Sequence, residues 1–132
     1  MTYSYTWTVK TGDTDFSGLI YTPTVIDHVV RGMEELMTEV DFSPSAAEER
    51  GLLYPAVHAE ADYVDSIGVD DTVVIELVPR VGDASITLAA RGTLKGELVF
   101  TAELTLACID AATGEPTHVP PDIRNRLQEY TE

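Results

Sequence analysis

The sequence is short of both cysteine and positive charge: its 132 residues include one cysteine, Cys108, and two lysines, Lys10 and Lys95. A single cysteine cannot form an internal disulfide bond, which fits a reducing, cytoplasmic setting. No stretch approaches the ~18 to 20 continuous apolar residues of a membrane-spanning helix. The start, MTYSYTWTVK, has neither the basic beginning nor the apolar run of a signal peptide. We therefore expect a cytoplasmic protein that does not enter a membrane.

The shortage of bases leaves a strong negative charge, since 8 lysines and arginines face 23 aspartates and glutamates and the net charge is −15. No basic patch is available to bind nucleic acid, so we expect no such partner. The acids are spread along the chain, for example at Glu34, Glu35 and Glu39, rather than gathered in a tail. At about 1 M salt the Debye length falls to roughly 3 Å, which screens the self-repulsion of such a surface. The charge therefore favours a halophilic protein over a merely acidic mesophilic one.

The rest of the composition is that of a folded protein, because 44% of the residues are apolar. The length fits a single domain, residues 1–132, that buries a core without disulfides or metal. Alternation of apolar and polar residues predicts five strands, at 3–11, 57–64, 73–77, 86–94 and 98–108.

A long helix is expected between the first two strands, because apolar residues from 23 to 40 recur at helical spacing. Its start carries two competing signals. Thr22 can cap the helix with Pro23 at the first helical position, or Thr24 and Asp27 can form a capping box.

Two shorter helical segments are expected, one near 46–50 and one that begins at 120–122. The long helix has a broad apolar face, and the antiparallel strands offer one apolar face against which to bury it. These elements predict an α+β domain of two layers.

The loop before the long helix, TGDTDFSGLIYTPTV, places Asp13 and Asp15 one residue apart. From residue 12 onward the chain resembles the hotdog-fold acyl-CoA thioesterases, in the branch similar to 4-hydroxybenzoyl-CoA thioesterase. The residues that carry the resemblance are GDTDFSG at 12–18, which matches the family's G-D-x-D-x-x-G, then LIY at 19–21, VDDTV at 69–73, CID at 108–110, TGEP at 113–116 and PPDIR at 120–124.

This resemblance implies a hotdog fold, in which a long central helix is wrapped by a curved antiparallel sheet of five strands. It implies hydrolysis of an acyl-CoA thioester to free acid and CoA, without a cofactor. It also implies a homodimer or homotetramer, because hotdog domains normally join their sheets edge to edge and form their sites between subunits.

The family's catalytic carboxylate is the second acid of the motif, which falls on Asp15. A carboxylate can attack a thioester directly or activate water, and both roles stay open. Backbone amides at a helix start are unpaired and carry partial positive charge, so those around Tyr21 to Thr24 are expected to hold the oxyanion. Thr22 is therefore grouped with Asp15 as catalytic, and Gly18, Tyr21 and Thr24 are expected to bind substrate. Many relatives carry histidine or tyrosine where this chain has Thr22 and asparagine where it has Thr24, which leaves the acyl group undetermined.

Asp13 and His28 receive structural interpretations. An aspartate in a turn commonly bonds its own backbone, and Asp13 is assigned that role. His28 is expected to be structural or to line the site. Cys108 lies in an apolar row and is expected in the core rather than at a reaction centre.

Other polar residues are weaker candidates. His58, Glu60 and Asp62 share one face of a strand, which could serve a metal but is more typical of a polar face or a subunit interface. We therefore expect no metal. In the resembled family this strand borders the active site of the adjacent subunit, so His58 is expected to line a pocket there. Arg91 and Lys95 are the bases preferred for the CoA phosphates.

Two other functions are compatible with the resemblance. One is a non-catalytic module that binds acyl-CoA. The other is a hotdog hydratase or dehydratase, which would use a histidine–acid pair at the helix and for which His28 is a poor match. Because a fold does not fix a chemistry, the choice between them depends on the site.

Overall fold

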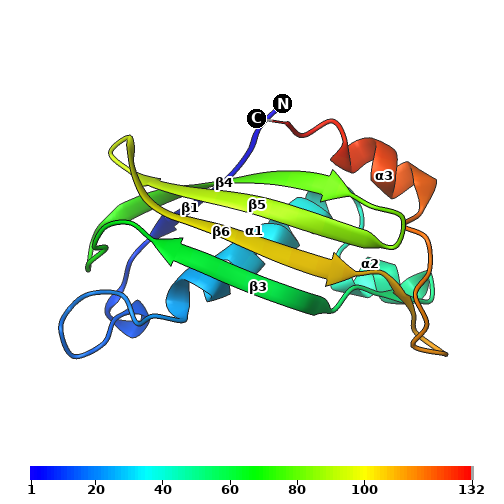
Figure 1. Cartoon of the computed structure of the whole chain (residues 1–132), viewed down its shortest axis with the longest axis horizontal. Coiled ribbons are helices and arrows are strands. Elements are labelled where there is room, and N and C mark those ends of the chain that lie inside the picture. The colour runs from blue at the N-terminus through cyan, green and yellow to red at the C-terminus, as the bar shows by residue number, and fades with distance from the viewer. Residues whose placement is uncertain (132) are drawn as a thin grey trace.

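The computed structural model describes residues 1–131 and is built around one five-stranded sheet (Figure 1). Its strands are β1 (Tyr3–Thr8), β3 (Ala56–Tyr63), β4 (Thr72–Val81), β5 (Ser85–Leu94) and β6 (Glu97–Ala107). Neighbouring strands are antiparallel and lie in the order β1-β4-β5-β6-β3. The two edges of the sheet are therefore β1 and β3.

Helix α1 (Thr24–Glu39) lies against one face of this sheet, behind it in Figure 1. Its buried stripe includes Val25, Val29 and Leu36, each with no exposed surface. Burying a side chain of this size stabilises the fold by about 1.5–3 kcal/mol. Gly32 permits the close approach, because a Cβ there would lie 3.1 Å from Leu77 Cδ1 and 3.2 Å from Tyr5 Cβ.

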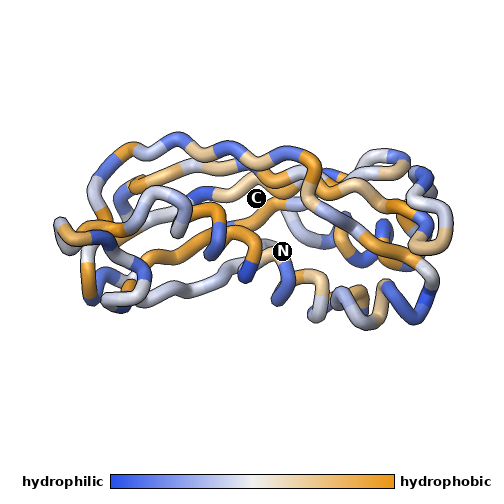
Figure 2. The backbone as a smooth tube through the Cα atoms, turned by 90° about the horizontal axis from the view of Figure 1, so that it is seen from below, coloured by the Kyte–Doolittle hydropathy of each residue, from blue (hydrophilic) through white to orange (hydrophobic). Residues whose placement is uncertain are grey.

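The strands supply the other half of the core through the alternation of apolar and polar residues. In Figure 2 this alternation appears as orange segments separated by blue and white ones. On β4, Val73, Ile75 and Leu77 face the helix and are fully buried. The residues between them, such as Glu76 and Val78, face away on the outer side of the sheet.

Short elements close the right-hand end of the molecule in Figure 1. Helix α2 (Pro44–Glu49) is capped by Ser43, whose Oγ accepts from Ala46 N at 3.2 Å. Strands β2 (Leu52–Leu53) and β7 (Ile109–Asp110) form a separate antiparallel pair, and α3 (Pro121–Leu127) follows β7. Within the portion that the structure describes, no helix combines the length and the apolar character needed to cross a bilayer.

The predicted α+β class, the five antiparallel strands and the long helix are confirmed. The first strand is shorter than predicted and ends at Thr8 instead of residue 11. Its continuation forms a turn, because Lys10 N donates to the Asp13 carboxylate at 2.9 Å and residues Thr11–Asp13 form the short 3-10 helix η1. β4, in contrast, continues to Val81, four residues beyond its predicted end.

Both predictions for the cap of α1 are wrong. Pro23 occupies the cap position, and no side chain caps the helix. The Thr24 hydroxyl is turned instead toward the preceding loop, where it donates to the carbonyl of Asp13 at 3.1 Å.

Candidate active site

The loop between η1 and α1 is a closed structure that holds Asp15 at the molecular surface. Asp15 N donates to Leu19 O at 2.9 Å, which closes the loop. Gly18 lies at φ +82°, a left-handed conformation that glycine adopts without steric cost. Ile20 N donates to Ile67 O at 2.9 Å, and this bond ties the loop to the segment before β4.

The carboxylate of Asp15 is anchored by Ser17 and is otherwise exposed. Ser17 donates to Asp15 Oδ1 twice, from its hydroxyl at 2.5 Å and from its backbone N–H at 2.8 Å. The hydroxyl bond and then the backbone bond hold the pKa of Asp15 below its ordinary value. Asp15 is therefore ionised at neutral pH, as a nucleophile or a general base must be.

Between Tyr21 and Thr24, where the loop meets α1, one backbone N–H is unoccupied. Of the amides from Tyr21 to Thr24, that of Tyr21 donates to Asp13 O at 2.9 Å and that of Thr24 donates to Tyr21 O at 2.8 Å. Pro23 has no N–H. Within residues 1–131 the Thr22 N–H has no protein acceptor, and its own carbonyl accepts from the hydroxyl of Tyr63 at the end of β3. An amide that is unpaired and fixed in this way is suited to hold an oxyanion.

Asp13 is the centre of a network that sequence reasoning missed. As predicted, its carboxylate bonds its own turn at Lys10 N, but it also accepts from Trp7 Nε1 and contacts His28 Nε2, both at 3.2 Å. His28 Nδ1 lies 3.1 Å from Tyr5 Oη, and its ring stacks on Trp7 with centroids 4.0 Å apart. Burial opposes ionisation of Asp13, yet the bonds from Lys10, Trp7 and His28 outweigh it and lower its pKa.

Apolar side chains gather around this loop at the same end of the molecule. Phe16 is fully exposed, and Leu19, Tyr21, Tyr63 and Val64 are between 43% and 58% exposed. A shallow pocket of about 380 Å³ lies between the loop and the end of β3, lined by residues 19–20 and 63–67. Exposed apolar clusters of this kind mark binding surfaces.

Comparison with known proteins identifies the family. A family model with the description "Thioesterase-like superfamily" matches residues 9–127. The chain belongs to the thioesterase-like superfamily. It is 28% identical, over 97% of its length and 88% of the relative's, to a 1,4-dihydroxy-2-naphthoyl-CoA hydrolase of Nostoc punctiforme.

Solved structures agree on the fold. A 1,4-dihydroxy-2-naphthoyl-CoA thioesterase from Synechocystis superposes with a TM-score of 0.90 at 18% identity, covering 98% of this chain and 97% of that one. A Staphylococcus aureus protein solved in complex with CoA superposes with a TM-score of 0.92 at 15% identity, covering 98% and 84%. The predicted hotdog fold and the predicted membership in a thioesterase family are confirmed.

The other residues that the sequence predicts to bind substrate in this thioesterase-family chain are not brought together beside the loop. His58 lies near the start of β3, whereas the loop contacts Tyr63 at its end, and His58 Nε2 is 3.7 Å from Glu60 Oε1. Thr24 is buried and its hydroxyl is used within the protein, so it has no free donor for a ligand. Lys95 occupies the β5–β6 turn at φ 52°. Figure 1 shows this turn at the same end of the molecule as the loop before α1.

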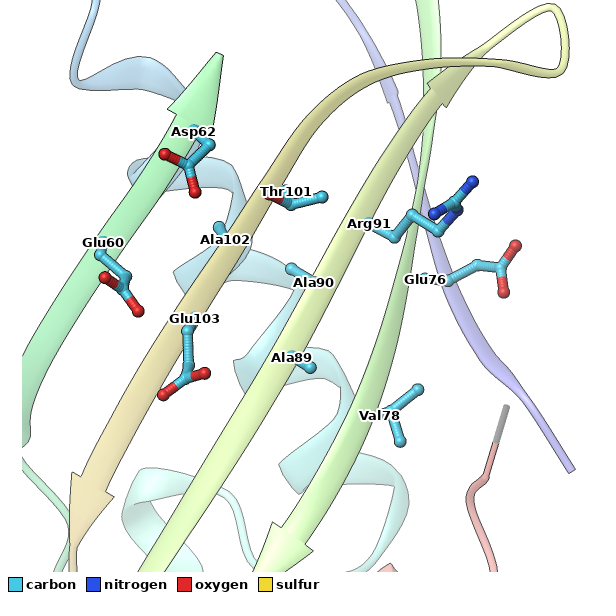
Figure 3. A pocket seen from close by; sticks show the side chains of 10 residues that line it. All are labelled: Glu60, Asp62, Glu76, Val78, Ala89, Ala90, Arg91, Thr101, Ala102 and Glu103. Atoms are coloured by element: carbon cyan, nitrogen blue, oxygen red, sulfur yellow. The ribbon is translucent and has the colours of Figure 1, made fainter. Parts of the chain in front are cut away.

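Arg91 lies on the outer face of the sheet, away from the helix. Figure 3 shows it at the border of a pocket of about 540 Å³ that is also lined by four carboxylates, those of Glu60, Asp62, Glu76 and Glu103. The negative charge of these carboxylates disfavours binding of a polyanion, such as the phosphates of CoA, in this pocket. Among residues 1–131, no three histidine, cysteine or acidic side chains are grouped as a metal site requires.

Proposed function

We propose that this protein hydrolyses an aromatic acyl-CoA thioester to the free acid and CoA, with Asp15 as the catalytic carboxylate. The observation that carries the proposal is that one loop, which leads into α1, holds both an exposed, ionised carboxylate at Asp15 and an unpaired backbone amide at Thr22. The names of the curated relatives support a fused aromatic acyl group as the first substrate to test.

The reaction needs only groups that the loop supplies. Oδ1 of Asp15 is held by Ser17, so Oδ2 is the oxygen that attacks the carbonyl carbon or takes a proton from water. The carbonyl oxygen gains negative charge, which the Thr22 N–H stabilises. Collapse breaks the carbon–sulfur bond and releases CoA as a thiolate, which takes the proton that Asp15 removed from water in the general-base route, or a proton from solvent in the nucleophilic route. In the nucleophilic route, water then hydrolyses the Asp15 anhydride.

The acyl group binds, in this proposal, against the exposed apolar side chains beside Asp15. Phe16, Tyr21 and Tyr63 bring three aromatic rings to that end of the molecule, and aromatic pairs gain about 0.5–1.5 kcal/mol beyond area burial. Lys95 is the preferred partner of a CoA phosphate, since Arg91 lies directly across from Glu76 and shares its pocket with three further carboxylates.

The active unit is a homodimer joined through β3, or a tetramer of that dimer, in a reducing cytoplasm. Every residue of β3 is at least partly exposed, and Val57, Tyr63 and Val64 leave apolar surface along this edge. An open edge with apolar side chains favours pairing with a second strand. Antiparallel pairing of two β3 strands would bring the His58 end of one strand toward the Tyr63 end of the other.

The test is release of free thiol from a panel of aromatic and aliphatic acyl-CoA substrates in high-salt buffer, with wild type beside Asp15→Asn. Loss of about 10²- to 10⁴-fold in kcat in the variant is expected, the usual contribution of such a group. Equal rates would exclude Asp15. Acyl-CoA binding without turnover in either protein would favour the binding module, and hydration of an enoyl-CoA without thiol release would favour the hydratase.

The dimer is tested separately by light scattering. Val57→Asp introduces a charge at the β3 edge and is expected to give a monomer with reduced activity. Thr6→Asp, on the exposed side of the opposite edge strand β1, is the matched control and should keep the assembly. A dimer that survives Val57→Asp but dissociates with Thr6→Asp would contradict the β3 interface.

A further inference from the structure

His28 lies outside the proposed chemistry but connects the two parts of the site. It is 7% exposed and lies one turn into α1. Its Nε2 lies 3.2 Å from Asp13 Oδ1, and Asp13 stands two residues before Asp15 in the chain. A buried polar ring in such a position is either satisfied core or a residue that positions the loop.

The hydrogen bonds of this network all point the same way: Tyr5 donates to His28, and His28 donates to Asp13. Asp13 is ionised, so its carboxylate only accepts and His28 Nε2 must carry the proton between them. Burial raises the pKa of Tyr5, which keeps its phenol protonated and able to donate to His28 Nδ1. These roles complete the chain of bonds from Tyr5 to His28 to Asp13, and among residues 1–131 no buried side-chain nitrogen or oxygen lacks a hydrogen-bond partner.

The backbone of Asp13 extends this network to the helix start. Its carbonyl accepts from Tyr21 N at 2.9 Å and from Thr24 Oγ1 at 3.1 Å. One residue thus joins β1, through Trp7, to the two residues that flank the Thr22–Pro23 pair. The side-chain bonds of Asp13 to Trp7, Lys10 and His28 therefore fix the residue whose backbone carbonyl holds Tyr21 and Thr24.

We infer that His28, acting through Asp13, is a positioning residue for thioester hydrolysis, which fixes the Asp15 loop relative to the Thr22 amide. This inference rests on the proposed function for its kinetic consequence, but the positioning itself can be measured without turnover. Misplacement of reacting groups by about 1 Å can cost on the order of 100-fold in rate.

Three variants separate the parts of the network. His28→Phe keeps a ring to stack on Trp7 and removes both hydrogen bonds. His28→Gln keeps an amide N–H that can donate to Asp13. Tyr5→Phe removes only the outer bond to Nδ1 and leaves the bond between His28 and Asp13 intact.

We expect His28→Phe to lower kcat by about 10- to 100-fold with little change in KM, because the reacting groups are displaced while the binding surface remains. His28→Gln should recover most of kcat, and Tyr5→Phe should stay close to wild type. All rates are measured well below the melting temperature of each variant and per mole of folded protein, so a loss of stability alone does not lower kcat.

Hydrogen exchange supplies the second measurement. The Asp15 and Tyr21 amides, which donate within the loop, should exchange faster in His28→Phe and regain protection in His28→Gln, while amides of β5 and β6 keep wild-type protection. Wild-type kcat in folded His28→Phe, or lowered kcat with unchanged loop exchange, would overturn the inference. If wild type itself releases no thiol, the proposed function fails, and loop exchange alone decides whether His28 positions the loop.

Discussion

Ser17 donates both of its hydrogen bonds to the same oxygen of Asp15, Oδ1, from the hydroxyl at 2.5 Å and from the backbone at 2.8 Å. Within residues 1–131 the other oxygen, Oδ2, accepts from no protein donor. The serine therefore does two things: it orients the carboxylate, and it stabilises the ionised form.

Ser17→Ala should make the enzyme more sensitive to acid. Because the hydroxyl bond is the larger cause that lowers the pKa of Asp15, its removal raises that pKa toward the ordinary value. The acid limb of the profile of kcat/KM against pH then moves to higher pH, so activity in acid falls more than activity at neutral pH. Ser17→Thr retains a hydroxyl and serves as the control. An acid limb at the same pH in all three proteins would contradict this role of Ser17.

Asp13→Asn should lower stability at neutral pH and much less in acid. The folded protein holds the pKa of Asp13 below its unfolded value, so its contribution is complete above the unfolded pKa and is lost as pH falls through the folded pKa. Hydrogen bonds to a charged group contribute about 1.5–3 kcal/mol, so a difference of that order is expected near pH 7.

Thermal unfolding of both proteins between about pH 3 and pH 8 measures this difference. Asp62→Asn is the control, since Asp62 is exposed on the outer face of the sheet. A gap in Tm between wild type and Asp13→Asn that stays constant over the whole range would show that the charge of Asp13 is not the cause.

The fold could be predicted from the sequence because its signals are local and repeated. The alternation in β4 and β6 and the helical spacing in α1 are long enough to average out single exceptions. The end of β1 could not be predicted, because it depends on a bond between Lys10 N and a carboxylate three residues later. The predictions for the cap of α1 were wrong for the same reason. The Thr24 hydroxyl donates to the carbonyl of Asp13, and local sequence preferences do not include such an acceptor.

The candidate site was predictable only in part. The motif located Asp15 and the helix start, but it gave no signal for Tyr63, which reaches Thr22 from 41 residues away. His28 and Asp13 were interpreted separately, since nothing in the sequence brings them within 3.2 Å. Two acids so close in sequence have different environments: Asp13 is joined to β1 and α1, whereas within residues 1–131 Asp15 forms hydrogen bonds inside its own loop alone.

Gly92→Ala should destabilise the fold, because Phe100 occupies the space above Gly92. A Cβ at position 92 would lie 2.1 Å from Cε2 of that ring, and the ring is fully buried. Overpacking of a core costs about 1–3 kcal/mol. Denaturant unfolding should detect this loss, whereas Gly12→Ala, which meets no atom within 4 Å, should change the free energy of unfolding little.

A double variant tests the cause of that loss. Gly92→Ala with Phe100→Leu removes the atoms that clash, so its loss of stability should be smaller than the sum of the two single losses. Additive losses would mean that the cost at position 92 comes from the backbone and not from Phe100.

Glu103→Gln should stabilise the protein at low salt and have little effect at high salt. Glu103 lies directly across from Glu60 in the β3–β6 pair, and both line the acidic outer pocket shown in Figure 3. Like charges that face each other across strands are destabilising by about 0.2–1 kcal/mol. Chemical denaturation with urea at about 0.1 M and 2 M KCl measures the effect, because the Debye length shrinks from ~10 Å to under 3 Å over that range.

The same titration tests adaptation to salt. With a net charge of −15, wild type should itself gain stability between the two salt concentrations, and the gain should be smaller in Glu103→Gln. Glu97→Gln is the matched control. It removes the same charge, but Glu97 faces Leu94 across the β5–β6 hairpin and has no carboxylate opposite it. If Glu97→Gln and Glu103→Gln gain equally at low salt, net charge and not the facing pair governs the effect. A wild type equally stable in both salts would contradict the halophilic interpretation, since an acidic surface that needs no screening is no adaptation to salt.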